Sequence, residues 1–373
     1  MAQPIELSRC WFIKPFFLHL HYMNASQLTH EALQVLQRLI SIPSVSRNET
    51  AAADFLFDYL KTKGANPQRH HNNIWCEQTT TKGNRPTLLL NAHIDTINPA
   101  ATWKHDPFTP CIEGDQLFGL GSNDCGGGLV ALMQVFLALQ HYKELPYHLI
   151  FLASAEEEVS GKTGIESVLP LLPPIDVALV GEPTGMQPAI AEKGLMVLDC
   201  TAHGRSGHAA RNEGMNAIYE ALPCIEWLRT FEFEKKTDLL GPVKTSVTMI
   251  NAGTQHNVVP DVCNFVVDVR ANECYTNEEI LAAIQAQWPT IDFKPRSTRL
   301  HSSRIDAQHP LIQRAMALGR TPFGSPTLSD QALMRFPSFK MGPGDSARSH
   351  TAEEFIRMSE IKEAIELYTQ LIG

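Results

Sequence analysis

The stretch PTLLLNAHID, residues 86–95, is a continuous apolar run that ends in the polar side chains of His93 and Asp95. Two later stretches repeat this arrangement, HLIFLASAE at residues 148–156 and DVALVGEP at residues 176–183. Continuous rather than alternating apolarity is typical of strands that helices cover on both faces. Helical segments such as ADFLFDYLKTKG, residues 53–64, alternate with these strands. The sequence therefore predicts an α/β fold with a mixed, largely parallel sheet and helices on both of its faces.

A second, smaller domain is predicted between residues 193 and 302. Its segments follow the order strand, helix, strand, strand and helix, with a possible last strand near residues 291–294. The stretches that carry this order are GLMVLDCTAHG, NAIYEALPCIEWLRTF, TSVTMINAG, CNFVVDVRAN and NEEILAAIQAQW. This order is typical of a ferredoxin-like α+β sandwich. We expect it to be inserted into a larger domain built from residues 23–192 and 303–373.

Composition favours small-molecule chemistry. The 373 residues suit two domains, and 43% hydrophobic with 19% charged residues is an ordinary globular balance. A net charge of −9 argues against a nucleic-acid partner, because such partners need clustered Lys and Arg. The eight cysteines form no C-x-x-C pair, so reduced thiols in a cytoplasmic protein are expected and no zinc thiolate site is predicted.

The first 22 residues resemble neither a signal peptide nor a membrane span. Their apolar part is interrupted at Arg9, Lys14, His19 and His21. Residues 1–22 are interpreted as an N-terminal extension, with Met23, ahead of a helical pattern, as the expected natural start in place of Met1. We therefore expect no membrane partner.

Carboxylate and imidazole side chains gather where the predicted strands end. In a parallel α/β sheet the ligand site lies beyond the carboxyl ends of the strands. The residues at these ends are His93, Asp95, Glu157, Glu158 and Glu182. Nitrogen and oxygen ligands of this kind suit Zn²⁺, Co²⁺ or Mn²⁺, and a metal pair also needs a bridging carboxylate. Taken singly, each residue has a simpler interpretation as a hydrogen-bonded or solvated side chain.

Five motifs in order make the sequence resemble one family. They are NAHIDT, GLGSNDCGGG, SAEEEVSG, VGEPTG and ARSHTAEEF. From about Leu28 onward the chain resembles the zinc-dependent amidohydrolases that include acetylornithine deacetylase, succinyl-diaminopimelate desuccinylase, aminoacylase and glutamate carboxypeptidase. The resemblance implies two zinc ions per subunit, with the larger domain catalytic and the inserted one a lid and dimerisation domain. Zn²⁺ would be replaceable by Co²⁺ or Mn²⁺.

The resemblance also implies a role for each strand-end residue. His93 and Glu182 would bind one metal, His350 the other, and Asp124 would bridge the two. Asp95 would orient the imidazole of His93. The glycines after Asp124 would let the backbone and the metals approach closely.

The glutamates of SAEEEVSG divide their roles in the same family. Glu157 would be the general base and Glu158 a metal ligand, with Glu156 a supporting acid. A shift by one residue, with Glu156 as the base and Glu157 as the ligand, is the open alternative.

The inserted domain contributes further residues by resemblance. His208 in HGRSGHAAR would reach the active site of the partner in a homodimer and stabilise the oxyanion. Asn257 and Arg270 would bind substrate, and Arg270 would hold the α-carboxylate of the substrate. The structural alternative for Arg270 is a surface salt bridge at the end of a strand. Lys193 and Ser329 are weaker candidates for the same pocket.

The closing segment KMGPGDSARSHTAEEFI looks most like that of acylornithine and acyl-lysine deacylases. We therefore expect deacylation of N-acetylornithine or N-succinylornithine, a reaction of arginine biosynthesis. Succinyl-diaminopimelate desuccinylase and dipeptidase or carboxypeptidase activities are the alternatives within the family. A metal-dependent binding protein without turnover is the alternative from another class.

Overall fold

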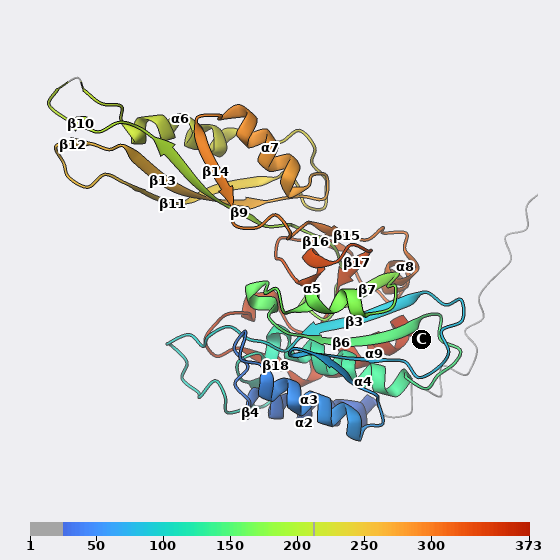
Figure 1. Cartoon of the computed structure of the whole chain (residues 1–373). Helices are drawn as coiled ribbons and strands as arrows, with labels where there is room; N and C mark the ends of the chain where they lie inside the picture. Colours follow the sequence, from blue (N-terminus) through green and yellow to red (C-terminus); the bar gives the residue numbers. More distant parts are fainter. Residues whose placement is uncertain (1–24, 212) are drawn as a thin grey trace, which may run out of the picture.

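The computed structural model describes residues 25–211 and 213–373, which form two bodies joined at a narrow connection (Figure 1). The proposed extension, the start at Met23 and Cys10 lie outside the described residues. The larger body contains a nine-stranded sheet and the smaller one a four-stranded sheet.

The nine-stranded sheet is parallel at its centre and mostly antiparallel toward its edges. Its central strands, in order, are β6 (His148–Ser154), β3 (Thr87–His93), β7 (Val177–Val180) and β17 (Ser338–Lys340). Beyond β6 lie β2 (Asn73–Glu77) and β1 (Gln68–His70), and beyond β17 lie β8 (Ala189–Glu192), β15 (Ser303–Arg304) and β16 (Phe323–Ser325). Every residue of β3, β6 and β7 is buried. The predicted mixed, largely parallel sheet is confirmed.

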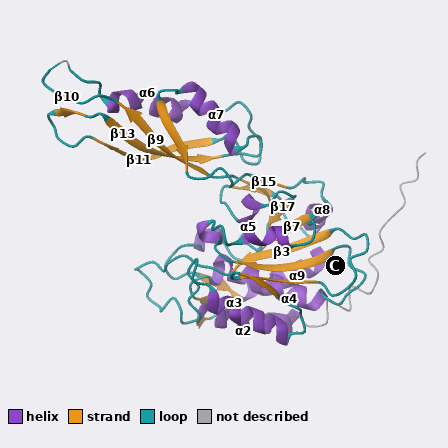
Figure 2. Ribbon diagram, in the orientation of Figure 1, coloured by secondary structure: helices purple, strands orange, loops and turns teal. Residues whose placement is uncertain are grey.

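Helices cover both faces of this sheet unevenly, with the long helices together on one face (Figure 2). The helices that pack into the main core are α2 (Ala25–Ile40), α3 (Thr50–Thr62), α4 (Gly127–Leu139), α8 (Pro310–Ala317) and α9 (Met358–Ile372). The other face is covered by the short α5 (Ile165–Val168) and by single-turn segments.

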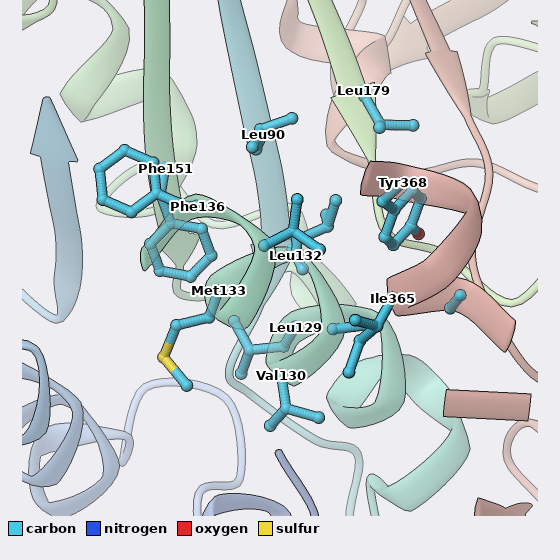
Figure 3. Packing of buried hydrophobic residues seen from close by; sticks show 14 of the residues in the cluster. Leu90, Leu129, Val130, Leu132, Met133, Phe136, Phe151, Leu179, Ile365 and Tyr368 are labelled. Atoms are coloured by element: carbon cyan, nitrogen blue, oxygen red, sulfur yellow. The ribbon is translucent and has the colours of Figure 1, made fainter. Parts of the chain in front are cut away.

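The central helix α4 is buried almost all round. Figure 3 shows Leu132 and Phe136 of α4 among Leu90 and Phe151 of the sheet and Tyr368 of α9. The stretch Ser122–Leu139 is long and apolar enough to cross a membrane, but 83% of it is buried inside the domain. It is therefore the core helix of this domain.

The glycines that begin α4 pack closely against neighbouring segments of the domain. A Cβ on Gly127 would overlap the side chain of Ile356, and a Cβ on Gly128 would overlap the carbonyl of Gly181. These glycines therefore let the start of α4 approach Ile356 and the segment after β7 closely.

A small three-stranded sheet lies beside the larger one. It consists of β4 (Cys111–Glu113), β5 (Gln116–Phe118) and β18 (Phe355–Arg357), all antiparallel. Its strands are only three residues long and carry no sequence periodicity that would have predicted them.

The second domain has the predicted ferredoxin-like order. Its elements are β9 (Met196–His203), α6 (Ala217–Thr230), β11 (Lys244–Ala252), β13 (Val262–Arg270), α7 (Asn277–Gln287) and β14 (Ile291–Pro295). A separate two-stranded antiparallel sheet pairs β10 (Gly207–His208) with β12 (Val258–Val259). The spatial order β11, β13, β9, β14 is antiparallel throughout. A self-contained apolar core lies between sheet and helices.

Candidate active site

His93 stands at the end of β3 with its imidazole buried. Its Nδ1 lies 2.9 Å from the main-chain oxygen of Asp95, so Nδ1–H donates to that carbonyl and Nε2 is the nitrogen left to bind a metal. Nε2 faces carboxylates, at 3.2 Å from Asp124 Oδ1 and 3.7 Å from Glu182 Oε1. The end of β7 supplies Glu182, so two adjacent parallel strands bring these side chains together. The arrangement prepares His93 to bind a cation through Nε2.

The carboxylate of Asp95 holds the glutamate turn more directly than it holds the imidazole. Oδ1 accepts from the N–H of Glu157 at 3.0 Å, while Oδ2 accepts from the N–H of Glu158 at 3.1 Å and from the hydroxyl of Ser46 at 2.7 Å. Its distance to Nδ1 of His93 is 3.6 Å. Orientation of the imidazole therefore comes mainly from the main chain, and the side chain of Asp95 fixes both glutamates.

Asp124 lies between two imidazoles. Its Oδ1 is 3.2 Å from Nε2 of His93, and its Oδ2 is 3.6 Å from Nε2 of His350. One oxygen facing each histidine is the arrangement that a carboxylate bridging two metals requires.

Glu354 fixes the loop that carries Asp124, a role the sequence did not reveal. Its Oε1 accepts from the N–H groups of Asn123 and Asp124 at 2.8 and 2.9 Å, and its Oε2 accepts from Gly121 at 3.1 Å. Burial raises the pKa of Glu354 to about 7. Only its position four residues after His350 could have drawn attention to it, and Glu353 beside it offers the same residue type.

The three consecutive glutamates point in different directions. Glu156 has a left-handed backbone with φ of 57°, and its carboxylate accepts a hydrogen bond from the hydroxyl of Thr163. Glu158 Oε2 lies 3.0 Å from Nε2 of His350, and Glu157 Oε2 lies 4.0 Å from Nε2 of His93. This geometry favours the register with Glu157 as the base and Glu158 as the ligand.

Among the described residues, the carboxylates of this cluster have only imidazoles as ion-pair partners, those of His93 and His350. Burial, and then the charge of Asp124, raises the pKa of Glu182 to about 8, and burial raises the pKa of Glu157 well above its ordinary value. The hydrogen bond to Glu158 raises the pKa of His350 to about 9.

The donor set fits a pair of divalent metals. Oε1 of Glu182 is buried with no hydrogen-bond partner among the described residues, although it faces His93. A buried carboxylate oxygen without a donor is costly unless a cation occupies the place of one. Imidazole and carboxylate ligands suit Zn²⁺, Co²⁺ and Mn²⁺.

Cys125 lies directly behind His93. The N–H of His93 donates to its Sγ at 3.2 Å, and burial raises the pKa of the thiol. The thiol therefore stays protonated and supports the backbone of His93.

Two of the predicted residues in the inserted domain lie far from this cluster. His208 and Asn257 lie at the two-stranded sheet of β10 and β12, at the end of the domain remote from the larger body (Figure 1). Both are exposed, and the N–H of Ala209 donates to the carbonyl of Asn257 at 3.0 Å. The chain does not bring them to its own cluster in this arrangement.

The remaining predicted substrate residues already have partners. Arg270 pairs with Asp268 through contacts of 2.8 and 3.1 Å, which is the structural alternative considered for it. Lys193 donates to the carbonyl of Pro242 at 2.9 Å. Ser329 is 1% exposed and donates to Glu192 at 2.8 Å. Each would have to change partner, or Ser329 become accessible, to contact a substrate.

Comparisons with known proteins agree with this site. The profile of peptidase family M20/M25/M40 matches residues 89–373. The chain is 28% identical to acetylornithine deacetylase of Proteus mirabilis, over 91% of this chain and 95% of that protein. It is 27% identical to succinyl-diaminopimelate desuccinylase of Corynebacterium glutamicum, over 93% of this chain and 97% of that protein.

Solved structures show the same fold at lower identity. Aminopeptidase PepT of Bacillus cereus has a TM-score of 0.74 and 17% identity, over 92% of this chain and 98% of that one. YXEP of Bacillus subtilis, described as a dinuclear metal-binding peptidase of the M20 family, has a TM-score of 0.67 and 17% identity, over 92% of this chain and 97% of that one.

Proposed function

Because the chain belongs to peptidase family M20/M25/M40 and is therefore a hydrolase, we propose that it cleaves the amide bond of an N-acyl amino acid with two divalent metal ions. Zn²⁺ is the proposed metal, with Co²⁺ or Mn²⁺ able to replace it. The observation that carries the proposal is Asp124, whose two oxygens face His93 and His350 at 3.2 and 3.6 Å.

The proposed ligands divide into two sets that share one residue. His93 and Glu182 would hold one ion, Glu158 and His350 the other, and Asp124 both. Such ions, when bound, polarise the amide carbonyl and make water more acidic.

Glu157 is the proposed general base. It would take a proton from the attacking water and deliver it to the nitrogen of the leaving amine. Its support is threefold: a buried carboxylate with a raised pKa, a position 4.0 Å from His93, and a main chain fixed by Asp95. A raised pKa suits a group that must first accept a proton and then release it.

The proposed substrate is N-acetylornithine or N-succinylornithine, which would place the reaction in arginine biosynthesis. The similarity to an acetylornithine deacetylase supports this choice. Nearly equal similarity to a desuccinylase favours succinyl-diaminopimelate as the second candidate. Arg270 would exchange Asp268 for the α-carboxylate of the substrate, because a guanidinium binds any carboxylate in the same bidentate manner. The free thiols among the described cysteines support a cytoplasmic location.

A homodimer through the inserted domain would complete this site. Strand β11 is an edge of its sheet, and Met249 and Ile250 on it are 65% and 56% exposed. Helix α6 adds Tyr219 at 69% exposure. Unpaired edge strands with apolar side chains favour pairing with a second chain. We propose that this face joins two copies and brings His208 of one chain to the cluster of the other.

Subunit mixing tests the dimer. The variants His208→Ala and Glu157→Gln are each expected to be inactive alone. Mixing them should restore part of the activity, since half of the sites in a heterodimer would combine an intact base with an intact His208. A monomeric enzyme that turns over normally would exclude this part of the proposal.

A hydrolysis panel tests the activity itself. N-acetyl and N-succinyl derivatives of ornithine, citrulline, lysine and diaminopimelate, with simple dipeptides, would be assayed with Zn²⁺ or Co²⁺ and after chelation. The Glu157→Gln variant is the inactive control. We expect metal-dependent release of amine from an acylated ornithine. No turnover on any compound, or turnover unaffected by chelation, would rule the proposal out.

A further inference from the structure

A second group of metal-binding side chains lies outside the catalytic cluster, at the three-stranded sheet. His105, Cys111 and Glu113 each offer one donor atom, and these atoms lie within 4.8 Å of one another. Nε2 of His105 is 3.6 Å from Oε1 of Glu113. Cys111 and Glu113 are two residues apart on β4, so their side chains share one face of that strand.

The imidazole of His105 is held in the orientation that a metal ligand needs. Its Nδ1 hydrogen-bonds to the carboxylate of Glu353, which leaves Nε2 facing Glu113. Its ring packs against Phe118, with centroids 5.4 Å apart, and Phe118 pairs with Cys111 across the hairpin. A carboxylate behind the imidazole is the arrangement found at many metal-binding histidines.

We propose that His105, Cys111 and Glu113 form a peripheral site for a divalent transition metal, separate from the catalytic pair. One imidazole nitrogen, one thiolate and one carboxylate suit Zn²⁺, and three protein ligands leave a position for water. His105 is 34% exposed and Glu113 is 60% exposed, so an ion can enter from solvent. Binding releases the thiol proton of Cys111 to solvent, so affinity rises with pH.

Occupation of this site would reach the catalytic loop through Glu353. That residue lies three positions after His350, and its carboxylate also accepts from the N–H groups of Lys104 and His105. A cation on Nε2 makes the Nδ1–H of His105 a stronger donor to Glu353. The ion would therefore hold the segment of His350 more firmly against the loop at His105.

Cobalt titration of the full-length protein tests the site, because thiolate bound to Co²⁺ gives a near-ultraviolet charge-transfer band that nitrogen and oxygen ligands do not give. The band is expected in the wild type and in the matched control Cys274→Ser, whose cysteine is also partly exposed. It should be lost in Cys111→Ser and His105→Ala, together with one equivalent of bound metal. Circular dichroism would show that these variants are folded.

Two results would overturn the inference. One is that Cys111→Ser has the same charge-transfer band and the same metal content as the wild type. The other is loss of the band only in Cys125→Ser, which would assign the thiolate to the pocket behind His93. Glu353→Gln gives a further measure, since losing the carboxylate behind an imidazole ligand lowers metal affinity by about 10- to 100-fold. An unchanged affinity in that variant would contradict the role given to Glu353.

Discussion

Replacing Glu354 with alanine should release the loop that carries the proposed bridging carboxylate. Glu354 is 2% exposed, and it accepts three main-chain N–H groups at 2.8, 2.9 and 3.1 Å. A buried donor left without an acceptor costs about 1–3 kcal/mol. Even the lower figure gives about 3 kcal/mol for three donors, which raises the equilibrium constant for local opening of the loop by about 100-fold.

Hydrogen exchange measured by mass spectrometry on chelated protein would detect this change in peptides covering residues 119–126. Glu354→Gln should show a smaller effect, because its amide oxygen can still accept from Asn123 and Asp124. The matched control is Glu353→Ala, since Glu353 accepts from Lys104 and His105 instead. If Glu354→Ala left exchange at residues 119–126 within twofold of the wild type, the three hydrogen bonds accepted by Glu354 would not stabilise this loop.

Three further outcomes are expected. Glu157→Gln should keep its metal and lose about 10²- to 10⁴-fold in kcat while Glu156→Gln stays near normal, and the reverse result would shift the register by one residue. Since burial raises the pKa of Glu182 from 4.5 to about 8, its protonation stabilises the chelated fold below pH 4.5, and this stabilisation is lost as the pH rises through about 8. Melting temperatures of chelated protein should therefore fall over that range more than those of metal-loaded protein, and a parallel pH dependence would contradict this. Gly128→Ala should lower the free energy of unfolding by about 1–3 kcal/mol, because its Cβ would overlap the carbonyl of Gly181, and an unchanged urea midpoint would refute the packing argument.

The strands that build the site could be predicted because burial on both faces leaves a plain signal. β3, β6 and β7 are wholly buried, and the ligands follow where each apolar run ends. The order of elements in the inserted domain could also be predicted from the sequence. Its strands and its two helices differ in the period with which apolar residues recur.

Contacts between distant segments could not be predicted. Glu354 resembles Glu353 in sequence, and only the fold decides that one binds the loop of Asp124 while the other binds the loop of His105. The sequence likewise could not show that Gly128, in the first turn of α4, lies against the main-chain carbonyl of Gly181, which follows β7. A sequence pattern indicates the secondary structure and burial that a residue favours, but not which distant segment packs against it.

The interruption of the larger domain has a consequence for synthesis on the ribosome. β17 lies between β7 and β8, and α9 completes the main core. The sheet and the core are therefore incomplete until residues 303–373 have been made. The inserted domain has its own apolar core and emerges before residues 303–373. It can therefore fold before residues 25–192 have all their packing partners, and those nascent strands expose apolar surface until β17 and α9 have emerged.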